Sequence, residues 1–201
     1  MKINYAKFQL ITYAVLAICF FSCFALEACP ITKKQTRYVL EDSDSISAQK
    51  VIIKFLQWYK LNINEANSFP ILIKDSENNY MVNPKAVIDY LNFIESSNCI
   101  SPKYIMLWQN FFDNKAVLLK KDKIQSDIPE DFDFDFVLIT QEPDLILNQL
   151  SDTRFKVISK DKKVALISMF FPEKEMMTYE FEMSKTNGSW QIDYISTSNF
   201  D

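Results

Sequence analysis

The chain has 201 residues, of which 48% are hydrophobic and 14% aromatic, and its formal net charge is −4. It contains no histidine and a single glycine, Gly188. Without histidine, the usual general base at neutral pH and the Ser-His and Cys-His nucleophile pairs are excluded. One glycine cannot build a Walker loop or a dinucleotide fingerprint, so no cofactor is expected. The acidic balance excludes nucleic acid as a partner.

The N-terminus carries the pattern of an export signal. Lys2 and Lys7 precede an uncharged apolar run over 8–26, and this charged-then-apolar order is typical of secretory signals. The run has nineteen residues, enough to span a bilayer, so residues 1–22 are predicted to be a signal or a retained membrane anchor. Both alternatives predict export, and for a bacterial chain the expected location is the periplasm or the outer membrane of the cell envelope.

Cysteine usage leaves two questions open. Cys23 follows a small residue late in the apolar run, as the acylated cysteine of a bacterial lipoprotein does, and we prefer it to Cys29 as the lipidation candidate. With Cys23 acylated, Cys29 could pair with Cys99; alternatively, Cys99 is a small buried apolar residue. The polar stretch that follows extends a predicted tether over 23–44, and a single domain is expected over 45–201.

Three amphipathic helices are expected in the first half of the domain. Ser45 is the candidate N-cap of the first, and Asn83-Pro84 and Ser101-Pro102 each place an N-cap residue before a proline at the first helical position. Each helix shows apolar residues at helical spacing. The stripes comprise Ile52, Phe55, Leu56, Tyr59 and Ile63, then Val87, Tyr90, Leu91 and Ile94, then Ile105, Trp108, Phe111 and Phe112.

The second half of the chain has the pattern of strands. A loose hairpin is expected earlier, over 69–82, and short β-branched and aromatic runs then predict five strands. The Asn187-Gly188 pair between the last two strands is a strong hairpin signal. Helices followed by antiparallel strands predict an α+β fold, with N-terminal helices packed on one face of a curved antiparallel sheet. The five predicted strands span 132–140, 154–160, 163–171, 176–185 and 189–197.

The segment 131–136 reads DFDFDF and has two interpretations. Its aspartates match the first ligand positions of a calcium loop, with Glu142 at the twelfth, but Phe136 stands where that loop needs glycine. With period two, the segment is instead a strand with three phenylalanines in the core and three aspartates in water. We therefore expect no metal, and an exposed acidic rim that could steer a cationic partner. The rim comprises Asp127, Glu130, Asp131, Asp133 and Asp135.

A family resemblance rests on four stretches. They are VIIKFLQWYK, NPKAVIDYLNFIESSNCISPKYI, IPEDFDFDFVLITQE and NGSWQIDYI. With them, the chain resembles a bacterial family of unknown function, domain of unknown function 3828, over about residues 46 to 196. The resemblance implies an exported or lipid-anchored protein with a cone-shaped, cystatin-like fold similar to nuclear transport factor 2. The stretches are patterns of core residues, so they support the fold better than any activity.

Two functions are compatible with the sequence. The first is a noncatalytic domain that binds an envelope protein or a small ligand at the membrane. The second is a small enzyme of isomerase or dehydratase type, with a buried carboxylate as base and a tyrosine as hydrogen-bond donor. Its pocket candidates are Tyr59, Asp89 and Tyr90, with Trp108 in an aromatic wall; otherwise these aromatic residues are core and Asp89 is exposed. A buried carboxylate facing a deep cavity would favour the enzyme.

Overall fold

The computed structural model describes residues 42–159, 163–172 and 177–198. All of them belong to one compact unit, Arg37–Asp201. The predicted signal or anchor, the tether up to residue 41, and the two candidate lipidation cysteines lie outside the described residues. Within the described ranges, no helix is both long enough and apolar enough to cross a membrane.

The first described helix, α2 (Asp42–Ala66), carries the predicted apolar stripe. Ser45 lies inside this helix, so its prediction as the N-cap is wrong. The error has a simple cause, since the polar residues of 42–45 include several good capping residues and local preference does not choose among them. Four stripe residues are buried and the fifth is half-buried; in order they are Ile52, Phe55, Leu56, Tyr59 and Ile63.

Helices α3 (Pro84–Glu95) and α4 (Pro102–Asp122) begin where the sequence predicts. The side chain of Asn83 accepts a hydrogen bond from the backbone N–H three residues on, at 3.4 Å, and Ser101 does the same at 3.3 Å. These contacts satisfy backbone donors that have no partner within the helix. The helix α4 ends at Lys123, whose φ of 52° closes it in the left-handed region.

The main sheet is antiparallel, with strand order β3-β4-β5-β6. Its strands are β3 (Arg154–Ser159), β4 (Val164–Phe170), β5 (Thr178–Thr186) and β6 (Ser189–Ser198). They confirm four of the five predicted strands. A register shift between Glu182 and Met183 interrupts the pairing of β5 with β6, and such irregularities bend a sheet.

The turn between β5 and β6 has the predicted geometry. Asn187 has a φ of 51° and Gly188 a φ of 83°, and Thr186 pairs directly with Ser189. Positive φ at both central positions is what a two-residue hairpin loop requires, because its twist then matches that of the strands. The only glycine of the chain therefore stands where its freedom is used.

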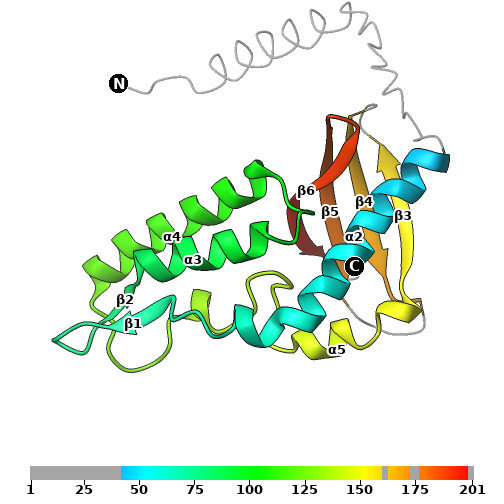
Figure 1. Cartoon of the computed structure of the whole chain (residues 1–201). Coiled ribbons are helices and arrows are strands. Elements are labelled where there is room, and N and C mark those ends of the chain that lie inside the picture. Colours follow the sequence, from blue (N-terminus) through cyan, green and yellow to red (C-terminus); the bar gives the residue numbers. More distant parts are fainter. Residues whose placement is uncertain (1–41, 160–162, 173–176, 199–201) are drawn as a thin grey trace, which may run out of the picture. The chain divides into compact units, whose positions relative to one another are not determined.

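One face of this sheet is covered by α2, which crosses in front of the strands in Figure 1 and contacts β6. Along β5, buried Tyr179, Phe181 and Met183 alternate with more exposed residues, as expected when only one face of a strand is in the core. The α+β class is therefore confirmed. The other buried hydrophobic residues described in the sheet are Ala165, Ile167, Met169, Trp190, Ile192 and Ile195.

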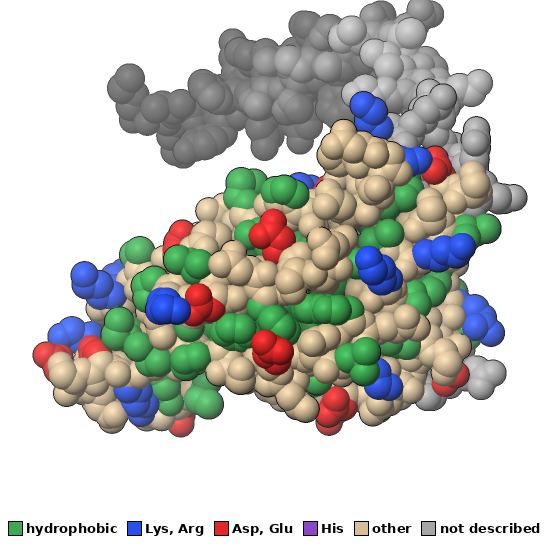
Figure 2. Space-filling model, viewed as in Figure 1, with side chains coloured by type: hydrophobic (Ala, Val, Ile, Leu, Met, Phe, Trp, Pro, Cys, Tyr) green, Lys and Arg blue, Asp and Glu red, His purple; other side chains and the backbone are tan. Residues whose placement is uncertain are grey.

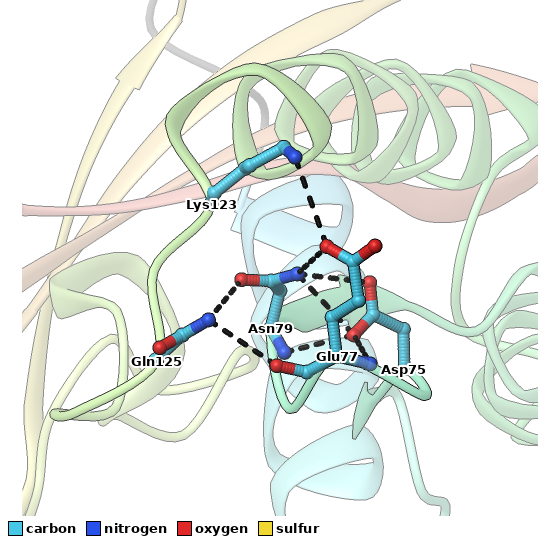
Figure 3. Close-up of polar contacts among 5 residues, drawn as sticks. All are labelled: Asp75, Glu77, Asn79, Lys123 and Gln125. Atoms are coloured by element: carbon cyan, nitrogen blue, oxygen red, sulfur yellow. Dashed lines mark hydrogen bonds and ion pairs between the residues drawn. The ribbon is translucent and has the colours of Figure 1, made fainter.

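A small hairpin of β1 (Leu72–Lys74) and β2 (Tyr80–Val82) confirms the prediction over 69–82. Its loop is braced by side chains, as Figure 3 shows: the Asp75 carboxylate accepts from the backbone and the amide of Asn79, which in turn accepts from Gln125 at 2.9 Å. The hairpin is thus tied to the segment that follows α4.

The remaining predicted strand, over 132–140, does not form, so that prediction is wrong. A short 3-10 helix, Glu130–Phe132, is followed by a tight loop in which the N–H of Ile139 donates to the carbonyl of Asp135 at 2.7 Å. The loop bends with Ile139 at a φ of 52°, although the sequence pattern predicts an extended strand here. Two short helices that were not predicted follow, α5 (Pro143–Leu147) and a 3-10 turn, Leu150–Asp152.

Packing explains why this segment is a loop. The ring of Phe136 lies 5.1 Å from that of Phe112 and 5.6 Å from that of Trp108, both on α4. Phe132 packs on the same cluster, 6.4 Å from Phe112. Both phenylalanines thus have aromatic partners on α4, and the edge-to-face pairs of Phe136 stabilise the arrangement beyond simple burial.

Candidate functional site

A pocket of about 410 Å³ lies where the end of α2, the β1–β2 hairpin, α3 and the loop after α4 meet. In the view of Figure 2, hydrophobic side chains gather over the region where these elements come together in Figure 1. The volume lies within the usual range for small-molecule sites. Its lining consists of Tyr59, Ala66, Asn67, Phe69, Pro70, Ile71, Leu72, Tyr80, Tyr90, Ile128, Phe132, Phe134, Asp135 and Phe136.

A hydrogen-bonded pair, Tyr59 and Asp135, forms the polar part of this pocket. The Tyr59 hydroxyl, on α2, donates to Oδ2 of Asp135 at 2.5 Å. The other carboxylate oxygen, Oδ1, accepts from the backbone N–H groups of Val137 at 3.0 Å and Leu138 at 2.7 Å. The carboxylate therefore organises the loop around itself, as an aspartate does at the start of a turn.

Burial sets the electrostatics of this pair. It raises the pKa of the Asp135 carboxyl above its ordinary value, although the hydrogen bonds from Tyr59, Leu138 and Val137 act in the opposite direction. Burial also raises the pKa of Tyr59, and the negative charge of Asp135 raises it further. Tyr59 is therefore neutral and a donor throughout the physiological pH range.

Two further tyrosines hold the walls of the site. Tyr90, on α3, lines the pocket, with its ring edge-on to Phe69 at 6.0 Å and to Phe136 at 6.0 Å. Tyr179, on β5, donates from its hydroxyl to the carbonyl of Leu138 at 2.9 Å. The loop is thus anchored to α2 through Tyr59 and to the main sheet through Tyr179.

Of the four predicted pocket residues, only Tyr59 and Tyr90 line this pocket. Asp89 lies on the outside of α3, where its carboxylate pairs with Lys85 at 2.5 Å. Trp108 is half-buried on α4 and lies behind the pocket lining, against Phe136. The carboxylate that meets Tyr59 is Asp135, which the sequence pattern places in water. That expectation is wrong, because Asp135 is 8% exposed.

The predicted acidic rim therefore has fewer exposed acids than the sequence suggests. Asp127, Glu130 and Asp133 are exposed, while Asp131 is partly covered and paired with Lys115. Glu130, Asp131 and Asp133 do lie together, around a shallow hollow of about 410 Å³ beside the loop. Among the described residues, no group of three or more acidic or cysteine side chains could hold a metal ion.

Another cleft, of about 450 Å³, lies at the start of α4. The ammonium of Lys103 lies there 3.4 Å from Glu182 and 3.8 Å from Asp193. Asp193 also accepts a hydrogen bond from the hydroxyl of Ser184 at 2.8 Å. The buried acid of this cleft therefore has a cationic neighbour, which distinguishes it from Asp135.

The sequence contains one signal for the inward aspartate that a search for alternation misses. Asp135 is followed by a continuous apolar run, Phe136, Val137 and Leu138. A strand with one solvent-exposed face would need a polar residue within this run. An aspartate before such a run can accept from the N–H groups two and three residues on, which starts a turn. Its contact with Tyr59, 76 positions away, has no local signal.

Comparison with family models, with curated proteins and with solved structures finds no match to this chain. The structure itself defines an α+β domain with an aromatic pocket around a buried carboxylate.

Proposed function

We propose that the protein is an exported, noncatalytic binding domain that holds a small and largely apolar ligand in the pocket of Tyr59 and Asp135. The pocket has the size of a small-molecule site, and its walls are mostly aromatic and aliphatic. A few polar groups, namely Asn67, Asp135 and the tyrosine hydroxyls, would fix the orientation of the ligand.

The hydrogen bonding of Asp135 favours binding over catalysis. Its carboxylate accepts from Tyr59 and from two backbone N–H groups, so most of its acceptor capacity already serves the loop. A general base needs a lone pair directed at the substrate, and a catalytic tyrosine donor needs its proton free for the substrate. The Tyr59 hydroxyl instead donates its hydrogen bond to Asp135.

The location and the finer fold also belong to this proposal. The sequence of residues 1–29 supports export, with removal of the signal and acylation at Cys23, or retention of an N-terminal anchor. The helix α2 on a bent antiparallel sheet supports a cone like that of nuclear transport factor 2. Intact-mass analysis of the protein from its native envelope tests the export proposal, and a full-length chain in the cytoplasm would contradict it.

Native mass spectrometry of the protein from its own envelope tests the binding proposal. We expect a bound small molecule, and we expect Asn67→Trp to lose it, because Asn67 is exposed and lines the pocket. Ser68→Trp is the matched control, since Ser68 is exposed on the same turn but does not line the pocket. Retention of the molecule in Asn67→Trp, or its loss in both variants, would place it elsewhere.

One observation supports the enzyme as a second candidate. A buried carboxylate of raised pKa beside a tyrosine in a pocket is the arrangement expected of a proton-transferring isomerase. Deuterium incorporation into cyclohexanone, followed by NMR, tests it. Exchange that the parent protein accelerates and Asp135→Asn does not would support the enzyme, whereas equal rates would support the binding domain.

A further inference from the structure

Within the described part of the chain, the carboxylate of Asp135 has no counter-ion. No Lys or Arg lines the pocket, and no ion pair joins Asp135 to a cation among the residues that the structure describes. A charged side chain that contributes to its raised pKa is another acid, Asp144. Buried charges are usually paired, because an uncompensated one is costly in a medium of low dielectric constant.

The walls around this charge are also suited to a cation. Seven of the lining residues are aromatic, and the faces of such rings carry negative potential. One lining ring already accepts a cation, since the ammonium of Lys74 lies 4.5 Å from the centre of the Tyr80 ring. The aromatic lining residues are Tyr59, Phe69, Tyr80, Tyr90, Phe132, Phe134 and Phe136.

We infer that the ligand of this pocket is an apolar organic cation, a protonated amine or a quaternary ammonium attached to a hydrophobic body. The inference rests on the proposed binding function and specifies its ligand class. The cationic group would lie near Asp135 and against the ring faces, and the hydrophobic body would fill the rest of the pocket. A neutral ligand would leave the carboxylate unpaired, and an anion would be repelled.

The surface beside the pocket supports the same ligand class. The acids Glu130 and Asp133 are exposed next to residues of the pocket wall, and Phe134 lines both this hollow and the pocket. Exposed charges of one sign raise the local concentration of a ligand of the opposite sign and speed its association. The acidic surface thus adds to the rate of binding, while Asp135 and the rings provide the affinity.

Three probes of one shape test this inference on the full chain. They are 4-phenylbutylamine, 4-phenylbutan-1-ol and 4-phenylbutyrate, which share a hydrophobic body and differ in charge. We expect the amine to bind at least about tenfold more tightly than the alcohol, and the carboxylate to bind most weakly. Calorimetric titration at pH 7 and low ionic strength measures each dissociation constant.

Two variants and a control locate the preference. Asp135→Asn removes the charge and should bring the amine and the alcohol within about threefold of each other. Asp122→Asn removes a charge of the same kind at an exposed position at the end of α4, which lines neither the pocket nor the hollow, and the tenfold preference should persist. Phe134→Leu keeps an apolar side chain at a half-buried position but removes a ring face, so it should weaken the amine more than the alcohol.

The outcomes separate this inference from the binding function. If the alcohol binds as well as the amine, the cation inference is overturned while the pocket remains a binding site. If no probe binds at about 10 mM, a very weak affinity, both proposals fail. A preference for the amine that survives in both Asp135→Asn and Phe134→Leu also overturns the inference. If Asp135→Asn fails to fold, the inference is decided by the order of affinities of the three probes and by the effect of Phe134→Leu on amine binding.

Discussion

Asp135 shows how one residue joins local and tertiary structure. Its Oδ1 accepts two N–H groups of its own loop, and its Oδ2 accepts the hydroxyl of Tyr59 from α2. Each hydrogen bond to the ionised form lowers the cost of burying the charge, and burial still outweighs them in its effect on the pKa. Two predictions concern this pair.

The first prediction concerns the pH dependence of stability. Because the folded protein holds the proton of Asp135 more tightly than the unfolded chain, the stability from this proton is fully present below about pH 4. It is lost as the pH rises through the raised pKa of the folded state. Relative to the parent, Asp135→Asn should therefore become more stable as the pH increases from 4 to 8. Urea denaturation at several pH values measures the difference, and a constant difference would contradict the prediction.

The second prediction concerns the hydroxyl of Tyr59. Tyr59→Phe keeps the ring but leaves Oδ2 of the buried Asp135 without this donor. We expect the free energy of unfolding to fall by about 1–3 kcal/mol. Tyr194→Phe removes a hydroxyl from an exposed tyrosine and should change stability by less than about 0.5 kcal/mol. Equal effects of the two changes in chemical denaturation would argue against a structural role of the pair.

At the scale of elements, the hairpin β1–β2 depends on a polar brace. Asn79 is buried, and its amide bridges the Asp75 carboxylate and the side chain of Gln125 (Figure 3). Hydrogen bonds from the backbone N–H and the side-chain amide of Asn79 are also the main reason that the pKa of Asp75 lies below its ordinary value. The brace connects the hairpin to the segment that leads into the pocket loop.

Loss of this brace should destabilise the hairpin. Asn79→Ala removes both the donor and the acceptor, and we expect the free energy of unfolding to fall by about 1 kcal/mol. Ser76→Ala, at an exposed position of the same loop, is the matched control and should have little effect. Hydrogen exchange of the β1 and β2 amides would show the change locally, and unchanged protection in Asn79→Ala would refute the brace.

The turn between β5 and β6 should depend on its glycine. A Cβ at Gly188 would meet no atom within 4 Å, so the cost of Gly188→Ala comes from the backbone, whose φ is 83°. We expect a loss of about 1 kcal/mol in thermal unfolding. Ser189→Ala, one residue further on at an exposed position, serves as the control. A neutral Gly188→Ala would mean that the turn tolerates another conformation.

At the scale of the whole molecule, Cys99 reports on opening of the core. Its side chain is 1% exposed, and burial raises the pKa of its thiol, so the reactive thiolate is rare and inaccessible. Iodoacetamide should modify Cys99 at least ~1000-fold more slowly in the folded protein than in urea. Peptide mapping distinguishes Cys99 from the other cysteines. Fast modification under native conditions would reveal local opening near this residue.

The elements that the sequence predicts correctly are those with local causes. The caps at Asn83 and Ser101, the stripe of α2, the alternation along β5 and the Asn187-Gly188 turn all arise from contacts within a few residues or from one repeating period. Such causes act wherever a chain has these residues, so the sequence determines the α+β class.

The pocket is different, because it was decided by tertiary structure. The DFDFDF segment has the period of a strand, yet its Phe132 and Phe136 pack on the aromatic surface of α4, and Tyr59 hydrogen-bonds its third aspartate. Neither partner adjoins the segment in sequence, and both contacts together outweigh a preference of local origin. The sequence alone therefore determined the three long helices, four strands of the main sheet and the tight turn. Only the folded chain decided that Asp135 faces inward, because a buried carboxylate requires donors that the tertiary structure brings to it.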